Sequence, residues 1–174
     1  MIAKVFMRKA RKAVSLVEIA MGLSIIAVVA AGAMFYFNNA NVSSRANEAM
    51  QQISALQEIV RTMYQSEGSY ANVTTAAVSQ SALLASRYKG PSNTIRSPFG
   101  STVTMGPAAS GTAFEITMNN VPASACQRLS TIDLGSGLQQ ITVGSTTVTG
   151  GAGLTAAQAN TACDGPTTIV WRFI

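Results

Sequence analysis

The feature that most constrains this chain is an apolar run over residues 19–37 that is led by a carboxylate, Glu18. As a helix the run would be about 28 Å long, close to the hydrocarbon thickness of a bilayer. A charge near the centre of a bilayer costs about 3 kcal/mol on insertion scales, and a lone membrane anchor gives it no partner. We therefore expect this segment to leave the lipid and pack against copies of itself, where Glu18 can meet a positive charge.

The helical pattern continues past the apolar run. Over residues 38–67, apolar side chains recur mostly at steps of three and four, the spacing of one helix face. One helix over residues 14–67, stopped by Gly68, would be about 81 Å long, so its first half is expected to lie in lipid or in an assembly. The apolar face holds Val42, Ala46, Ala49, Met50, Ile53, Leu56, Val60, Met63 and Tyr64, and the polar face holds Arg45, Asn47, Glu48, Gln51, Gln52, Gln57, Glu58 and Arg61.

Positive charge is concentrated at the N-terminus, where Lys4, Arg8, Lys9, Arg11 and Lys12 precede the apolar run. These residues favour a cytoplasmic N-terminus. The remaining seven basic residues match the seven acidic ones, so the rest of the chain is formally neutral. The sequence pI of about 9.6 therefore does not indicate nucleic-acid binding.

The N-terminal segment has two simpler interpretations. A basic stretch, an apolar stretch and small residues ending at Ala33 are typical of a secretory signal peptide cleaved there. Against this, Glu18 interrupts the start of the apolar core, and the helical pattern runs on beyond Ala33. The other alternative is an ordinary uncut membrane anchor with a helical stalk, in which Glu18 has no role.

The composition argues against an enzyme. The chain has no histidine, which excludes Ser-His-Asp and Cys-His nucleophile pairs and histidine metal sites. The acidic residues after Glu18 are scattered, and no phosphate-binding loop, dinucleotide fingerprint or EF-hand pattern occurs. We predict no catalytic, cofactor-binding or metal-ligating residues, and no cofactor.

The two cysteines, Cys126 and Cys163, have three interpretations. In an exported protein an even pair indicates a disulfide, and closing a loop of about 38 residues would stabilise the fold by about 4 kcal/mol. The second interpretation is that the two cysteines are unrelated buried thiols. A metal site is less favoured, because two thiolates without histidine or further cysteine leave the metal's ligand shell incomplete.

The C-terminal part is predicted to be a small β-rich domain. Strands are expected over residues 102–105, 113–118, 139–143 and 168–173, the last being strongly β-prone. Short helices are expected over 78–88, 123–129 and 155–163, with a loop over 90–100 and an exposed Gly/Ser/Thr-rich turn over 144–153. The fold class that these elements indicate is α+β, with a long N-terminal α-helix followed by a small β-rich domain.

Residues 8–31 resemble the N-terminus of a type IV prepilin. That family has a basic leader, a small residue before the cut and a hydrophobic helix with glutamate at the fifth mature position. A cut between Ala13 and Val14 puts Glu18 at that position. The resemblance departs at Ala13, where glycine is usual, and at Val14, where Phe, Met or Leu is commoner.

The rest of the chain resembles the type IVb branch, especially the major pilins of bundle-forming and conjugative thin pili. The stretches that carry this resemblance are residues 97–100, 114–117 and 121–122, followed by Cys126, then Cys163 and residues 168–173. The resemblance implies the type IV pilin fold, in which a long N-terminal α-helix packs against a C-terminal antiparallel β-sheet. It implies a leader over 1–13, a hydrophobic helix over 14–38, its amphipathic continuation over 39–67, a connecting loop over 68–100 and a sheet domain over 101–174 with a disulfide-bounded region over 126–163.

The resemblance also implies a mechanism and partners. A prepilin peptidase in the inner membrane of a Gram-negative bacterium would remove the leader and methylate the new amine of Val14. Glu18 of one subunit would then pair with the Val14 ammonium of its neighbour in a helical homo-oligomer. Assembly would need inner-membrane pilus machinery, and the extracellular filament would serve adhesion, aggregation or conjugation at a host or recipient cell surface.

Two other classes share some of these features. A minor pilin, or a pseudopilin of a secretion or DNA-uptake machine, has the same N-terminus, but major secretion pseudopilins usually lack a C-terminal disulfide loop. A membrane-anchored binding module would tolerate the loss of Glu18. The cysteine pair and Glu18 therefore favour the major structural subunit of a pilus.

Overall fold

The computed structural model describes residues 15–135 and 137–174 and divides into two compact units. One unit ends at Asn39 and the other is Ala40–Ile174. The predicted leader and cut site, including Ala13 and Val14, lie outside the described residues.

The first element is a single long helix, α1 (Leu16–Tyr64), which contains both the apolar run and the amphipathic segment. The prediction of one long helix is confirmed, although the helix ends at Tyr64 rather than Glu67. Gly68 follows with a φ of 64°, a left-handed conformation that glycine adopts without steric cost. No proline occurs before Pro91, so nothing in the sequence interrupts the helical hydrogen bonds.

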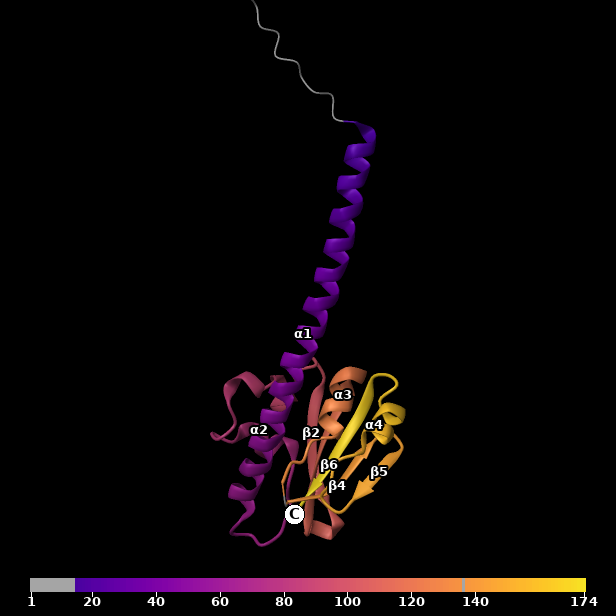
Figure 1. The fold of residues 1–174 in the computed structure, drawn as a ribbon. Helices are drawn as coiled ribbons and strands as arrows, with labels where there is room; N and C mark the ends of the chain where they lie inside the picture. The colour runs from indigo at the N-terminus through magenta and orange to yellow at the C-terminus, as the bar shows by residue number, and fades with distance from the viewer. Residues whose placement is uncertain (1–14, 136) are drawn as a thin grey trace, which may run out of the picture. The chain divides into compact units, whose positions relative to one another are not determined.

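The second unit contains a six-stranded antiparallel sheet with the order β1-β2-β3-β6-β4-β5. The C-terminal strand lies inside the sheet (Figure 1). Its Trp171 pairs with Ile116 on one side and with Ile141 on the other. The strands are β1 (Ile95–Arg96), β2 (Thr102–Ala108), β3 (Ala113–Val121), β4 (Leu138–Val143), β5 (Thr146–Thr149) and β6 (Thr167–Phe173).

Both edge strands lie in segments that the sequence pattern predicted to be loops. β1 is within the expected loop 90–100, and β5 is within the expected turn 144–153. The loop predictions were wrong there for the same reason. β1 is only two residues long, and β5 consists of Thr146–Thr149 between glycines, so neither has the alternating apolar pattern that predicts a strand.

The second half of α1 packs on one face of the sheet. Ile53, Leu56 and Val60 belong to the same buried cluster as Trp171 and Phe173. Because side chains alternate along a strand, the opposite face of the sheet carries the polar residues. There, Arg172 on β6 donates to Glu115 on β3 at 2.6 Å and to Gln140 on β4 at 3.0 Å, which ties three neighbouring strands together.

One residue of α1 is not where the helical pattern placed it. Gln52 was expected on the polar face, but its side chain is fully buried. Its amide nitrogen donates to the backbone oxygen of Arg96 in β1 at 2.6 Å, which connects the helix to the edge of the sheet. The prediction failed because helical periodicity assigns a face from polarity alone, whereas a buried amide is tolerated when it forms a hydrogen bond.

The C-terminal end of α1 is fastened to the loop that follows it. The Tyr64 hydroxyl donates to the backbone oxygen of Asn72 at 3.0 Å, and the side chain is buried. Burial, with a smaller contribution from the charge of Glu67, raises the pKa of this phenol above its usual value. The neutral form is favoured in the fold, so this contribution to stability persists up to about pH 10 and is lost as the pH rises through the raised pKa.

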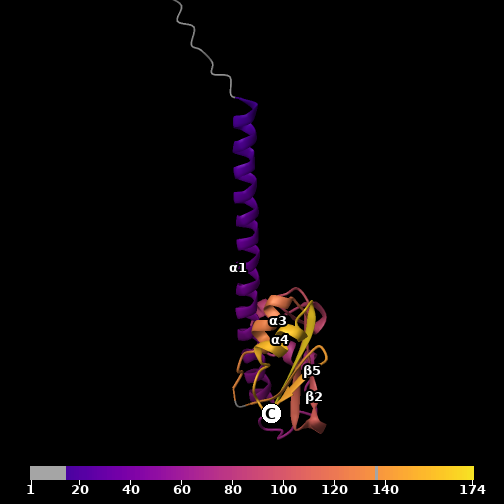
Figure 2. The ribbon, with the colours of Figure 1, turned by 45° about the vertical axis from the view of Figure 1, so that its right-hand side comes forward.

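The described part of the second unit also has three short α-helices: α2 (Thr75–Gln80), α3 (Ala123–Ser130) and α4 (Ala156–Ala162). The helices near 123–129 and 155–163 are as predicted, but the helix expected over 78–88 is wrong. It begins earlier because the Thr74 side chain accepts a hydrogen bond from the backbone nitrogen of Ala77, which caps α2. α3 contacts both α4 and β6 (Figure 2).

Candidate assembly helix and disulfide-bounded region

The first unit consists mostly of a helix whose apolar side chains have no cover. Leu16 is 86% exposed and Phe35 is 77% exposed, and the large apolar side chains between them are also exposed. Within the described residues, α1 is the one helix long and apolar enough to cross a membrane. Such a surface cannot remain in water, so it requires either lipid or other apolar helices around it.

Glu18 lies in the first turn of α1, where a carboxylate interacts favourably with the helix dipole. Its side chain is exposed, and no cation pairs with it among residues 15–135 and 137–174. The arrangement is therefore an apolar helix with one acidic group at its N-terminal end. The amine proposed to pair with Glu18, on Val14, is outside the described residues.

Ser15 is a functional candidate that the sequence reasoning missed. Its hydroxyl accepts a hydrogen bond from the backbone nitrogen of Val17 at 3.3 Å, and its carbonyl oxygen accepts from the backbone nitrogens of Glu18 and Ile19 at 3.0 and 3.1 Å. The Ser-x-x-Glu spacing of Ser15 and Glu18 is a capping-box signature that could have identified it. Ser15 thus defines where the helix begins and places Glu18 in its first turn.

The cysteines are joined by a disulfide between Cys126 in α3 and Cys163 at the end of α4, with Cα atoms 5.7 Å apart. Both residues are almost completely buried. The free-thiol alternative is thus excluded, and the bond closes the predicted disulfide-bounded region. Its burial means that a reductant in solution reaches it only when this region opens.

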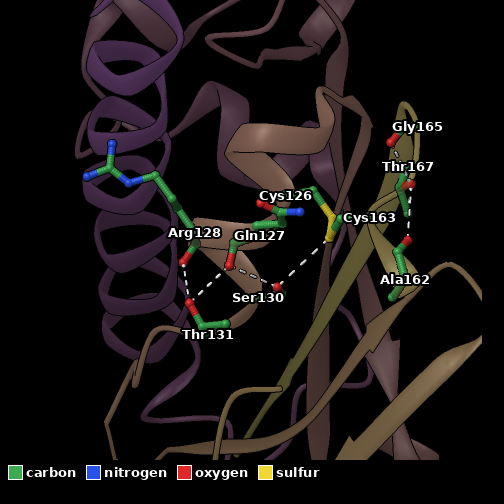
Figure 3. The surroundings of a disulfide bond; sticks show 9 residues. All are labelled: Cys126, Gln127, Arg128, Ser130, Thr131, Ala162, Cys163, Gly165 and Thr167. Carbon is green, nitrogen blue, oxygen red and sulfur yellow. Dashed lines mark hydrogen bonds between the residues drawn. A yellow bond between two sulfur atoms is a disulfide. The ribbon is translucent and has the colours of Figure 1, made fainter. Parts of the chain in front are cut away.

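Serine and threonine hydroxyl groups near the disulfide donate hydrogen bonds to backbone carbonyl oxygens (Figure 3). The buried Ser130 hydroxyl donates to the Gln127 carbonyl oxygen at 3.2 Å and lies 4.0 Å from the Cys163 sulfur. On the other side, Thr167 donates to the carbonyl oxygen of Gly165 at 3.0 Å, which connects the end of α4 to β6. Arg128 donates to Ser43, so α3 is also linked to α1.

Gly153, within the disulfide-bounded region, leaves no room for a side chain. A Cβ atom at this position would lie 2.7 Å from the backbone oxygen of Ser130, which itself accepts a hydrogen bond from Leu154 at 2.7 Å. We expect Gly153→Ala to lower the free energy of unfolding by about 2 kcal/mol, because backbone must move to admit the methyl group. Urea unfolding of the detergent-solubilised chain, followed by the fluorescence of the single buried tryptophan, Trp171, measures this effect.

Gly165→Ala is the matched control for that prediction. Gly165 follows Cys163 by two residues, just outside the disulfide-bounded region, and a Cβ there would meet nothing within 4 Å. We expect this variant to unfold at nearly the wild-type urea concentration. Equal stability of the two alanine variants would contradict the close approach at Gly153.

The described residues hold no group of three or more potential metal ligands among histidine, cysteine, aspartate and glutamate. The arrangement that the structure does present is an uncovered apolar helix joined to a sheet domain with a buried cross-link. Such an arrangement can bind other copies of the same helix.

A family profile described as the N-terminal region of PilS matches residues 43–173. The major structural subunit of the bundle-forming pilus of Escherichia coli O127:H6 is 31% identical over 139 residues, covering 78% of this chain and 72% of that protein. The corresponding subunit of Escherichia coli O111:H- matches with the same identity and coverage.

Two solved structures share the fold. The crystal structure of a type IVb pilin from Salmonella typhi is 25% identical, with a TM-score of 0.58, and the match covers 72% of this chain and 97% of that one. The structure of TcpA, a type IV pilin from the Vibrio cholerae El Tor biotype, is 20% identical, with a TM-score of 0.52 and coverage of 75% and 99%. The second likeness bears on the fold alone.

Proposed function

The chain belongs to the type IV pilin family, in the PilS-like type IVb branch, and from that premise we propose that it is the major structural subunit of a type IVb pilus. The observation that carries the proposal is the uncovered apolar surface of α1 between Leu16 and Phe37. Many copies packed side by side would cover this surface, which gives a homo-oligomeric filament outside the cell. Neither the matched relatives nor the solved folds favour a minor pilin, a pseudopilin or a membrane-anchored binding module.

In this proposal the chain is made with a leader over residues 1–13. A prepilin peptidase removes the leader by cutting between Ala13 and Val14, and the new amine of Val14 is then methylated. Residues 14–38 hold the subunit in the inner membrane before assembly and form the filament core afterwards. Residues 39–67 support the globular part, which comprises the connecting loop 68–100 and the sheet domain 101–174. The assembly machinery of the inner membrane moves the subunit from one environment to the other.

The same helix suits both environments because lipid and a bundle of apolar helices are similar solvents for its side chains. The difference between them is Glu18, which is unpaired in lipid and gains a cationic partner in the filament. Glu18 therefore favours assembly over the membrane-dispersed state, and it sets the register of one helix against the next.

N-terminal sequencing of the extracellular protein tests the proposal. Filaments are sheared from cells, imaged by negative-stain electron microscopy, and the chain purified from them is sequenced. We expect it to begin at Val14 with a methylated amine. A chain beginning at Met34 would indicate ordinary secretion, and an intact chain beginning at Met1 and retained in the membrane would indicate an anchor.

The cut site itself is tested by enlarging the residue before it. We expect Ala13→Leu to trap the full-length chain in the inner membrane, because a peptidase that requires a small residue there cannot accommodate the isobutyl side chain. Immunoblotting of membrane and sheared fractions measures the ratio of the two forms. Ala13→Gly is the control and should be processed at least as well as wild type. Efficient processing of the leucine variant at Val14 would show that the cut is elsewhere.

A further inference from the structure

The free edge of β5 presents unpaired backbone groups. β5 is the last strand of the sheet and pairs only with β4. The backbone nitrogen of Gly150 donates to the Gln139 oxygen at 3.0 Å, so the backbone of Gly150 faces β4. Backbone groups alternate sides along a strand, so Thr147 and Thr149 direct theirs away from β4. No other described strand pairs with that outer side.

β5 is short, with four residues, but it lacks the other features by which sheets usually prevent pairing with other chains. Natural edge strands are kept short or carry lysine, proline or bulges. The opposite edge follows that rule, because β1 is only two residues long and includes the exposed Arg96. β5 consists of three threonines and a valine, and residues 134–163 contain no Asp, Glu, Lys or Arg. A second copy of this region could therefore approach without charge repulsion.

We propose that β5 of one subunit pairs in antiparallel fashion with β5 of a second copy in a neighbouring filament, joining filaments side by side. The inference rests on the proposed function, since it needs filaments to join. A two-fold axis through Thr147 places this residue directly opposite Thr147 of the second copy. The outward N–H and C=O groups of the two residues then bond to each other, as in a hydrogen-bonded pair of an antiparallel ladder. The same register places Thr146 of one strand opposite Val148 of the other.

The occupant is a second copy because the edge is self-complementary and uncharged, and because every subunit of a filament carries one such edge. One four-residue strand forms few hydrogen bonds and would bind weakly alone. Two parallel filaments that engage many such edges at once gain avidity without any new contact. The pairing would thus be negligible between free subunits and strong between filaments.

Thr147→Pro is the direct test, because proline removes the outward N–H group without removing any backbone hydrogen bond of the subunit's own sheet. It also removes the hydroxyl that lies 3.1 Å from the Thr142 hydroxyl on β4, so the control variant must lack that hydroxyl too. Thr147→Val is the matched control, since it keeps both the donor and the branched side chain. Sheared filaments are imaged in 50 mM salt, and two quantities are scored: the number of filaments per cell and the fraction lying in bundles. We expect the bundled fraction to fall about tenfold for the proline variant and to be unchanged for the valine variant, with filament numbers equal in all three.

Thr147→Lys provides a second variant that leaves the backbone of β5 intact. Two lysines would face each other across the axis, so we expect bundles to be lost at low salt and recovered at about 1 M salt, where the Debye length is about 3 Å. If the lysine variant failed to bundle because β5 was misfolded, adding salt would not restore the bundles.

Filament number reports on the proposed function, whereas the bundled fraction reports on the pairing. Wild-type filaments that remain single, or proline and lysine variants that bundle like wild type, would overturn the pairing alone. Loss of individual filaments in both variants would also overturn it, because the edge would then be a contact within one filament. Loss of attachment to a surface with unchanged bundling would assign the edge to a different partner.

Discussion

Replacing Glu18 with alanine is expected to lower the yield of sheared filaments by about a hundredfold or more while the subunit remains in the membrane. In the filament, the carboxylate and the Val14 ammonium of a neighbour would be buried together. Removing one member of a buried ion pair leaves the other charge uncompensated and costs about 3–5 kcal/mol. Since each 1.4 kcal/mol is a factor of ten, this loss at every subunit contact is enough to prevent polymerisation.

Two further variants separate the charge of Glu18 from its place in the helix. Glu18→Gln keeps the sequence signature of a capping box with Ser15 but has no charge, and we expect it to fail as alanine does. Glu58→Ala removes an exposed carboxylate from the second half of the same helix and should assemble normally. Subunit levels in the membrane fraction serve as the reference for all three.

The outcomes are distinct. Normal filament yield from the alanine variant would exclude an assembly role for Glu18. Normal yield from the glutamine variant alone would mean that capping of α1, and not the ion pair, is what the filament requires. Loss of the alanine variant from the membrane would place its defect before assembly, contrary to the expectation.

Breaking the disulfide is expected to remove a large part of the stability of the second unit. A cross-link between residues 37 positions apart, as for Cys126 and Cys163, contributes about 4 kcal/mol in the chain-entropy model. Domains of this size are typically stable by about 5–15 kcal/mol in total. Cys126→Ser or Cys163→Ser should therefore lower the steady-state level of the subunit several-fold through proteolysis, although α1 is unchanged.

The comparison of single and double variants isolates the cross-link from the free thiol it leaves behind. We expect the double alanine variant at Cys126 and Cys163 to be depleted about as much as either serine variant, because all three lack the bond. Immunoblotting of whole cells measures the subunit level. Recovery of the wild-type level in the double variant would attribute the defect to a reactive thiol rather than to lost stability.

Thiol labelling of the wild-type subunit tests the bond directly. Because both sulfurs are in the disulfide, no label should be incorporated by the native or by the denatured, unreduced chain. In the folded chain the bond is also buried, which keeps a reductant from it. Reduction should add two labels only after denaturation. Two free thiols in the denatured, unreduced chain, or a bond found only between chains, would contradict the intramolecular pairing.

Local sequence patterns predicted some elements well and others poorly. The long helix was predictable because its periodicity and the absence of proline before Pro91 are local properties. The helices that carry or adjoin the cysteines were predictable for the same reason. The helix at Thr75–Gln80 was misplaced because the capping hydroxyl of Thr74 was not considered.

The edges of the sheet were not predictable from these patterns. β5 reads as a turn because threonines between glycines have no alternation of apolar and polar residues, and it becomes a strand through pairing with β4. Gln52 reads as a surface residue, yet it is buried because an oxygen of β1 is within hydrogen-bonding distance. Local propensity reveals neither partner. For β5 the partner is the neighbouring strand β4, and for Gln52 it is the backbone of Arg96, 44 residues further along the chain.

The sequence by itself determined that an acidic residue leads an apolar helix, that the rest of the chain is formally neutral, and that two cysteines are available to pair. These are properties of composition and spacing, and they hold whatever the fold. Only the tertiary structure decided that β6 lies between β3 and β4, that Cys126 and Cys163 bring α3 and α4 together, and that β5 is left with a free edge. Strand order and edge exposure depend on which distant segments bury one another's apolar faces, and that choice is made by the packing of the whole domain.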